Sequence, residues 1–286
     1  MPRLLAVGHV TWDRLSERQA LGGAVTYAAL QARKLGWEAA VLTAAGPDFE
    51  PARDLPGVDV FARTGAATTR FTNLYEPAGE RRQVLSARAG PIDLAVLPDA
   101  WRDPDVLLLG PVAGEVAAGT AAAFAAEVVG AGAQGWLRAF DADGTVSACD
   151  WPDPGADLAG VHVLLLSEHD LKDAGERART FLTYVPIVAL TRGWEGSRLF
   201  TRDGVQDVPT LPREEVDPTG AGDVFAAALL VGYHETGDVA EAAAFAACAA
   251  SCAVEGVGAS SLGDRAEIER RLALRQRLIE EGEWDE

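Results

Sequence analysis

Short runs of large apolar residues recur along the chain, separated by longer segments rich in small and helix-forming residues. Residues 4–7 and 106–109 are continuous apolar runs, which are typical of strands buried on both faces of a parallel sheet. Strands that alternate with helices predict right-handed crossovers, helices on both faces of the sheet and a ligand at the carboxyl ends of the strands. Further strands are expected at residues 38–44, 161–166 and 187–190, and helices at residues 22–35, 114–129, 239–254 and 265–281 and directly after residue 223.

Residues 58–89 lack helical segments and contain short runs with β-strand character instead. Residues 71–75 and 82–85 are joined by a turn-forming segment at residues 76–80, which predicts a hairpin. A second hairpin, at an edge of the main sheet, is expected at residues 197–208.

The length, the net charge and the cysteine content of the chain argue against several classes of function. The chain has 286 residues, enough for one large α/β domain or two small ones. Its formal net charge of -18 argues against binding to nucleic acid or to an anionic membrane, because both partners need a cationic patch. The apolar run at the start is too short for a signal peptide or a membrane span, so we expect a cytoplasmic protein. Cys248 and Cys252 lie in an Ala-rich helical segment and are expected to be packing residues.

Residues 217–223, with the sequence DPTGAGD, directly precede an apolar helical run. Small residues at a helix N-terminus leave backbone N–H groups uncovered, and these donors together with the helix dipole form an anion site. Asp223 lies beside this site, where a carboxylate can act as a general base toward a phosphoryl acceptor. Alternatively, Asp223 is only an acid of the first helical turn and the glycines only form a turn.

A resemblance to a known family decides between these two interpretations. Residues 217–223 resemble the D-T-x-G-A-G-D signature of the pfkB, or ribokinase-like, carbohydrate kinases, and residues 22–29 resemble the G-G-x-x-x-N-x-A motif of the same family. The two motifs occur in the right order, roughly 200 residues apart. The resemblance covers nearly the whole chain and implies one domain over residues 1–286. It implies a single three-layer α/β/α domain with a mainly parallel sheet, and an ATP-dependent kinase of small alcohols.

The resemblance also implies roles for individual residues, with ATP and Mg²⁺ as cofactors and a monovalent cation as a further candidate. Asp223 is the expected base, and Mg²⁺ is expected near Asp170, bound through water. Three positions depart from the family pattern: Tyr27 stands where the family usually has Asn, and Ser167 and Asp170 replace the ends of an N-x-x-E element. The other implied residues are Gly220, Ala221 and Gly222 for the anion hole, Asp13, Gly22 and Gly23 for the substrate, and Thr191, Gly193, Gly220, Gly222 and Gly256 for ATP.

The family resemblance further implies a small β lid, which we assign to parts of about residues 13–21 and 58–89. Such a lid excludes water that would otherwise accept the phosphoryl group, and in the family it often pairs with a second subunit, so a homodimer through the lid is expected.

Residues 134–138, QGWLR, are similar to the Q-G-x-x-R element of inositol kinases within this superfamily. On a strand, Gln134 and Arg138 would share a face and reach a polyhydroxylated ring; alternatively, Arg138 forms a structural salt bridge. Myo-inositol is therefore the first expected acceptor. The alternatives are another sugar such as fructose or ribose, a sugar acid such as 2-keto-3-deoxygluconate, a nucleoside, or a non-catalytic protein that senses a polyol.

A G-x-G-x-x-G match at residues 130–135 points to dinucleotide binding, but its context argues against that function. The fingerprint requires a strand before it and a helix after it, whereas the sequence predicts the reverse order.

Overall fold

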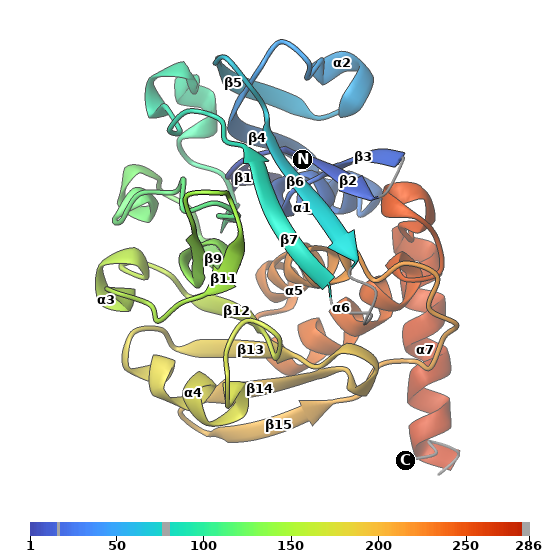
Figure 1. Ribbon diagram of the computed structural model, residues 1–286. Helices are drawn as coiled ribbons and strands as arrows, with labels where there is room; N and C mark the ends of the chain where they lie inside the picture. Colours follow the sequence, from blue (N-terminus) through green and yellow to red (C-terminus); the bar gives the residue numbers. More distant parts are fainter. Residues whose placement is uncertain (16–17, 76–80, 282–286) are drawn as a thin grey trace.

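A nine-stranded, mainly parallel sheet forms the centre of the molecule (Figure 1). The computed structural model describes residues 1–15, 18–75 and 81–281. The strand order is β15-β14-β13-β12-β9-β8-β1-β4-β5, and antiparallel pairing occurs only between β13 and β14 and between β14 and β15. The predicted α/β class is confirmed. The strands are β1 (Arg3–Val7), β4 (Glu38–Ala45), β5 (Asp59–Thr64), β8 (Val106–Leu109), β9 (Val128–Gly132), β12 (Val163–Ser167), β13 (Ile187–Thr191), β14 (Ser197–Thr201) and β15 (Gly204–Val208).

The central strands are nearly continuous apolar runs because both faces of the sheet are covered. Leu4 and Ala6 of β1 belong to one buried hydrophobic cluster, and Leu5 and Val7 belong to another. Successive side chains of a strand point to opposite faces, so each cluster fills one face of the sheet.

Four long helices pack against the first of these clusters. Helices α5 (Ala221–Thr236) and α6 (Val239–Ala253) are rich in small residues, which lets their backbones approach closely: a Cβ added at Gly232 of α5 would lie 3.2 Å from the Cα of Ala242 in α6. The last helix, α7, is largely exposed and buries only Ile268 and Arg271. Over the described residues, no helix combines the length and the apolar character needed to cross a bilayer. The long helices are α1 (Ala24–Lys34), α5 (Ala221–Thr236), α6 (Val239–Ala253) and α7 (Arg265–Glu281), and the short ones are α2 (Pro51–Asp54), α3 (Pro154–Asp157) and α4 (Ala174–Thr180).

The helix predicted at residues 114–129 is wrong. That segment contains one 3-10 turn, Thr120–Ala123, and then enters β9 at Val128. Gly114 and Gly119 have φ angles of 69° and 71°, a left-handed conformation that interrupts a right-handed helix. The apolar end of the segment is instead used as a strand between β8 and β12.

A second, four-stranded sheet with the order β3-β2-β6-β7 forms the lid predicted from the sequence. Of the described strands within residues 58–89, β6 and β7 belong to this small sheet, whereas β5 belongs to the main sheet. The turn predicted at residues 76–80, and residues 16 and 17 of the other expected lid segment, lie outside the described residues. The strands are β2 (Thr11–Leu15), β3 (Arg18–Gly22), β6 (Thr69–Tyr75) and β7 (Arg81–Ala87), and a separate two-stranded sheet contains β10 (Arg138–Phe140) and β11 (Val146–Ala148).

Candidate active site

The glycine turn before α5 has the geometry of an anion site. Gly220 has φ 82° and ψ -5°, and no side chain caps the helix that begins at Ala221. A Cβ at Gly222 would meet no atom within 4 Å, so the first turn of the helix borders open space. Because the first N–H groups of a helix have no partner within the helix, this N-terminus can receive a negatively charged group.

Asp217 fixes the turn against the loop that follows α6. One oxygen of its carboxylate accepts a hydrogen bond from the Thr219 N–H at 3.0 Å, and the other accepts one from the Gly258 N–H at 3.2 Å. The carbonyl of Val254 accepts the N–H groups of Val216 and Asp217. The anion site is therefore held in place before any ligand arrives.

Asp223 lies in the first turn of α5 and is half-buried. Its pKa is raised to about 7: desolvation by burial is the largest cause, the carboxylates of Asp170 and Asp13 act in the same direction, and the Arg138 guanidinium acts in the opposite one. A carboxyl group with a pKa near neutrality can both accept and release a proton at physiological pH. Its position and its pKa both suit a general base.

The charges of Asp170 and Arg138 both act on Asp223. Asp170 accepts a hydrogen bond from the Ser167 N–H at 2.8 Å. Burial raises its pKa, and the Ser167 N–H, Arg138, His169 and the Gln134 side chain act in the opposite direction. The two residues of the QGWLR segment therefore meet at Asp170, as part of one polar cluster with Asp223.

The local structure of that segment differs from the prediction. Gln134 lies in a 3-10 turn, Gln134–Trp136, and Arg138 begins β10, so the two do not share one strand face. Their convergence arises from the tertiary fold instead. Arg138 donates a hydrogen bond to the Val112 carbonyl at 3.4 Å, and its guanidinium lies 5.5 Å from the ring centroid of Phe71 in lid strand β6.

Asp13 comes from lid strand β2 and depends on the glycine pair. Its carboxylate accepts a hydrogen bond from the Thr11 hydroxyl at 3.0 Å, and a Cβ at Gly22 would lie 2.1 Å from its other oxygen. Gly23 has φ 92°, and a Cβ there would lie 2.4 Å from the His9 carbonyl. In this structure the pair therefore accommodates Asp13 and the neighbouring backbone, whereas the sequence suggested that it lets a ligand approach.

Tyr27 contributes to the site in a way that the sequence did not reveal. Its side chain is 3% exposed, and a Cβ at Gly220 would lie 2.5 Å from its ring. Burial raises its pKa, and Asp223, Asp13 and Asp217 raise it further. The Tyr27 ring therefore packs against the glycine turn, and the charges of Asp223, Asp13 and Asp217 act on its phenol group.

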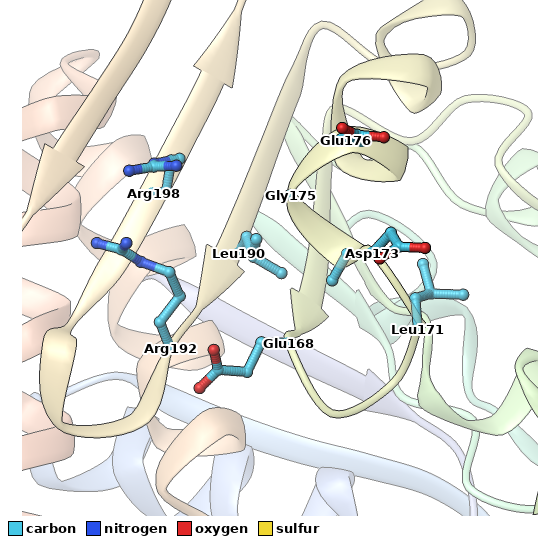
Figure 2. A pocket seen from close by; sticks show the side chains of 9 residues that line it. Glu168, Leu171, Asp173, Gly175, Glu176, Leu190, Arg192 and Arg198 are labelled. Atoms are coloured by element: carbon cyan, nitrogen blue, oxygen red, sulfur yellow. The ribbon is translucent and has the colours of Figure 1, made fainter.

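A hollow of about 370 Å³ lies beyond the ends of β12 and β13. Figure 2 shows Arg192 and Arg198 on one side of it and Asp173 and Glu176 on the other.

Two of the residues predicted to contact ATP follow the same strand end: the Thr191 hydroxyl donates to the Leu166 carbonyl at 3.2 Å, and Gly193 has φ 54°. Gly256, the remaining predicted ATP contact, packs against Ser260 and Ser261 on the α6 side of the glycine turn.

The G-x-G-x-x-G match does not have the context of a dinucleotide site. Strand β9 contains Gly130 and Gly132, and a 3-10 turn follows in place of a helix. A Cβ at Gly130 would lie 2.4 Å from a methyl group of Leu230, so this glycine allows α5 to pack closely on the sheet.

Comparison with known proteins agrees with this geometry. Residues 157–265 match the model of the pfkB family carbohydrate kinases. An inositol 3-kinase from Arabidopsis thaliana is 31% identical over 137 residues, which is 46% of this chain and 37% of the relative. A nucleoside kinase from Methanothermobacter thermautotrophicus is 36% identical over 87 residues, 30% of this chain and 28% of the relative.

The chain thus aligns with well under half of the length of these two relatives. The solved structures extend the likeness to the whole fold. A pyrophosphate-dependent kinase of the ribokinase family, complexed with a pyrophosphate analog and myo-inositol, has a TM-score of 0.76 at 21% identity, and the match covers 94% of this chain and 99% of the other. The chain therefore has the ribokinase-like fold, and its residues 157–265 match the model of the pfkB family carbohydrate kinases.

Proposed function

We propose that this protein is an ATP-dependent kinase that transfers the γ-phosphoryl group to a hydroxyl of a small polyol, with myo-inositol as the first acceptor to test. The observation that carries this proposal is the position of Asp223, with a pKa of about 7, beside an uncapped helix N-terminus. Asp223 removes the proton of the acceptor hydroxyl. The N–H groups of Gly220, Ala221, Gly222 and Asp223 hold the transferring phosphoryl group.

The groups around Asp223 suit a polyhydroxylated acceptor. Asp13 supplies carboxylate acceptors, while Gln134 and Arg138 supply donors. The similarity to an inositol 3-kinase and to a structure that contains myo-inositol supports this choice. The similarity to a nucleoside kinase keeps other acceptors open, namely nucleosides, fructose, ribose and sugar acids.

Two exposed apolar side chains beside the glycine turn favour a nucleotide as the donor. Val216 and Val257 are 57% and 52% exposed, and each directly precedes one residue of the Asp217–Gly258 hydrogen bond. Exposed apolar side chains next to an anion site suit a heterocyclic base joined to a phosphate chain. Thr191 and Gly193, at the end of β13, would contact the remaining phosphates, and Gly256 would border the base.

The acidic cluster suits a magnesium ion bound with the nucleotide. The carboxylates of Asp170 and Asp223 each raise the cost of charging the other, and a hard divalent cation offsets such repulsion. Asp170 would hold Mg²⁺ through water. When bound, the ion neutralises the charge of the triphosphate. A monovalent cation and pairing of two subunits through the lid remain further expectations.

The test is ADP release from Mg-ATP with a panel of acceptors: myo-inositol, ribose, fructose, 2-keto-3-deoxygluconate and nucleosides. Each acceptor is also offered with pyrophosphate, because that donor is named for a structural relative. Strong turnover of myo-inositol with ATP is the expected result. Turnover of another acceptor alone would keep the kinase and reject inositol, while polyol binding by calorimetry without turnover would favour the sensor.

The acid limb of the pH profile provides a second test. The base is active when deprotonated, so kcat/KM is expected to rise with pH through about 7, where Asp223 loses its proton. Arg138 lowers the pKa of Asp223, so Arg138→Gln should move this limb to higher pH. Arg88→Gln is the matched control, because Arg88 stacks on Phe140 at 5.5 Å in the same way but does not perturb Asp223. Equal profiles for all three proteins would contradict the assignment.

A further inference from the structure

Three possible metal ligands meet at the edge of the sheet opposite the candidate active site. Asp105 directly precedes β8 and Glu127 directly precedes β9, and these strands are parallel neighbours. His234 lies in the last turn of α5, the helix whose first turn contains Asp223. Asp223 and His234 therefore lie about 16 Å apart along the helix axis, and the cluster is separate from the glycine turn.

The distances within this cluster fit a shared ion. Nε2 of His234 lies 3.0 Å from Oε2 of Glu127 and 4.0 Å from Oδ1 of Asp105. The three ligand atoms all lie within 4.8 Å of one another. Ligands at about 2.0–2.2 Å from a zinc ion are separated by roughly 3–3.5 Å, so only a small inward movement of Asp105 is needed. We propose that Asp105, Glu127 and His234 bind a divalent transition-metal ion, with Zn²⁺ as the probe.

The charge at this place favours a cation. Two carboxylates lie within a few ångströms of each other, in a chain with a formal net charge of -18. The C-terminal end of α5, which points at the cluster, adds the negative end of a helix dipole. Imidazole together with carboxylates is a ligand set that zinc and similar ions accept.

Two of the three ligands are already oriented by their neighbours. The ring of Trp37 packs edge-on against His234 with centroids 5.2 Å apart, and the Trp37 indole N–H is fixed by the Glu235 carboxylate at 2.9 Å. The second oxygen of Asp105 accepts the Arg3 N–H at 2.6 Å. Such outer contacts orient metal ligands in known sites. The third ligand, Glu127, has a side chain that is 72% exposed, so it can adjust.

His162 also lies near this cluster, but its ring nitrogens have different hydrogen-bond partners from those of His234. Nδ1 of His162 accepts the Val129 N–H at 3.0 Å, which places the proton of the neutral ring on Nε2. Nδ1 of His234, in contrast, has no hydrogen-bond partner within the described part of the chain. In the ion-free chain the proton lies on Nε2, which donates to the Glu127 carboxylate at 3.0 Å, and a metal ion bound at Nε2 would displace this proton to Nδ1.

The bound ion would tie the C-terminal end of α5 to β8 and β9. Because three protein ligands leave coordination positions for water, the site would be accessible to solvent. An ion that binds only the folded chain stabilises that chain by mass action. The expected consequence is greater thermal stability, without a part in the chemistry.

The test uses the full chain after treatment with a chelator, with Zn²⁺ added in the absence of nucleotide. Calorimetry should give one zinc equivalent at this site, and the melting temperature should rise. Glu127→Gln and His234→Gln should each weaken zinc binding about tenfold or more and remove the thermal shift. His169→Gln is the control, since it removes an exposed histidine elsewhere and should leave both results unchanged.

Absence of zinc binding by the unaltered chain would overturn the proposal, and so would equal binding by the Glu127 and His234 variants, because the ion would then bind elsewhere. Glu127 is largely exposed, so its variant is expected to fold even if the His234 variant does not, and it decides the matter alone. Co²⁺ gives a second readout, since its visible absorption should respond to loss of the imidazole ligand.

Discussion

Asp223→Asn is expected to lower turnover about a thousandfold while ATP still binds. The amide has the shape of the carboxylate but cannot take the acceptor's proton, and general-base catalysis contributes about 10²–10⁴-fold. The backbone N–H groups of the glycine turn are unchanged, so the phosphate site remains. Turnover is measured with the acceptor that the panel identifies, and ATP binding is measured by calorimetry.

The control for this variant is Asp203→Asn, which alters an exposed acid in the turn between β14 and β15. It should leave turnover and ATP binding as they were. Near-normal turnover of Asp223→Asn would remove Asp223 from the role of base, whereas loss of ATP binding would mean that the charge of Asp223 is needed to organise the turn.

Gly220→Ala is expected to disrupt the site and to destabilise the fold by about 3 kcal/mol. A left-handed backbone costs a residue with a Cβ about 1–2 kcal/mol, and overpacking adds about 1–3 kcal/mol. Both costs apply here, because Gly220 has φ 82° and its Cβ would lie 2.5 Å from the Tyr27 ring. Denaturant unfolding gives the change in stability, and steady-state kinetics give the loss of turnover.

Gly222→Ala separates the two effects. Its Cβ would meet no protein atom within 4 Å, and Ala is favoured over Gly within a helix, so stability should hold or increase. Turnover should nevertheless fall, because the added methyl group projects into the space assigned to the phosphoryl group. If Gly220→Ala has the same free energy of unfolding as the unaltered chain, the Tyr27 ring does not restrict the size of residue 220.

Most strands of the main sheet, with the exceptions of β5 and β9, could be predicted because each one carries its own signal. Residues 106–109 were predicted as a strand and β8 has those bounds, and β1 differs from the predicted residues 4–7 by one residue at its start. A strand buried on both faces is a continuous apolar run, which a sequence displays without reference to any other segment. The family resemblance predicted from residues 217–223 agrees with the family model that matches residues 157–265, whereas residues 22–29 lie outside that match.

The alanine content of residues 114–129 favours a helix, but the glycines of this segment interrupt it. Gly114 and Gly119 adopt left-handed conformations, and the apolar end of the segment gains more by completing the sheet as β9 than by extending a helix. Local propensity is a weak guide where tertiary pairing offers an alternative.

The candidate site could be predicted only as a set of residues without their arrangement. Gln134 and Arg138 were assigned to one strand face, yet they meet at Asp170 from a 3-10 turn and a separate short strand. Tyr27 is recognisable in the sequence only as a departure from the family pattern, because its contact partner Gly220 lies far away along the chain. Contacts between distant segments leave no local periodicity, so the raised pKa of Asp223 could not be inferred either.

The position of Asp13 on lid strand β2 links proton affinity to lid position. Asp13 belongs to the same sheet as Phe71, which contacts Arg138, while Asp223 belongs to α5. Because Asp13 raises the pKa of Asp223, any displacement of β2 away from α5 lowers the affinity of Asp223 for its proton. By thermodynamic reciprocity, a protonated Asp223 favours the closed lid and an ionised one resists it. In the proposed reaction, transfer of the acceptor's proton to Asp223 would therefore favour closure of the lid at the moment when water must be excluded.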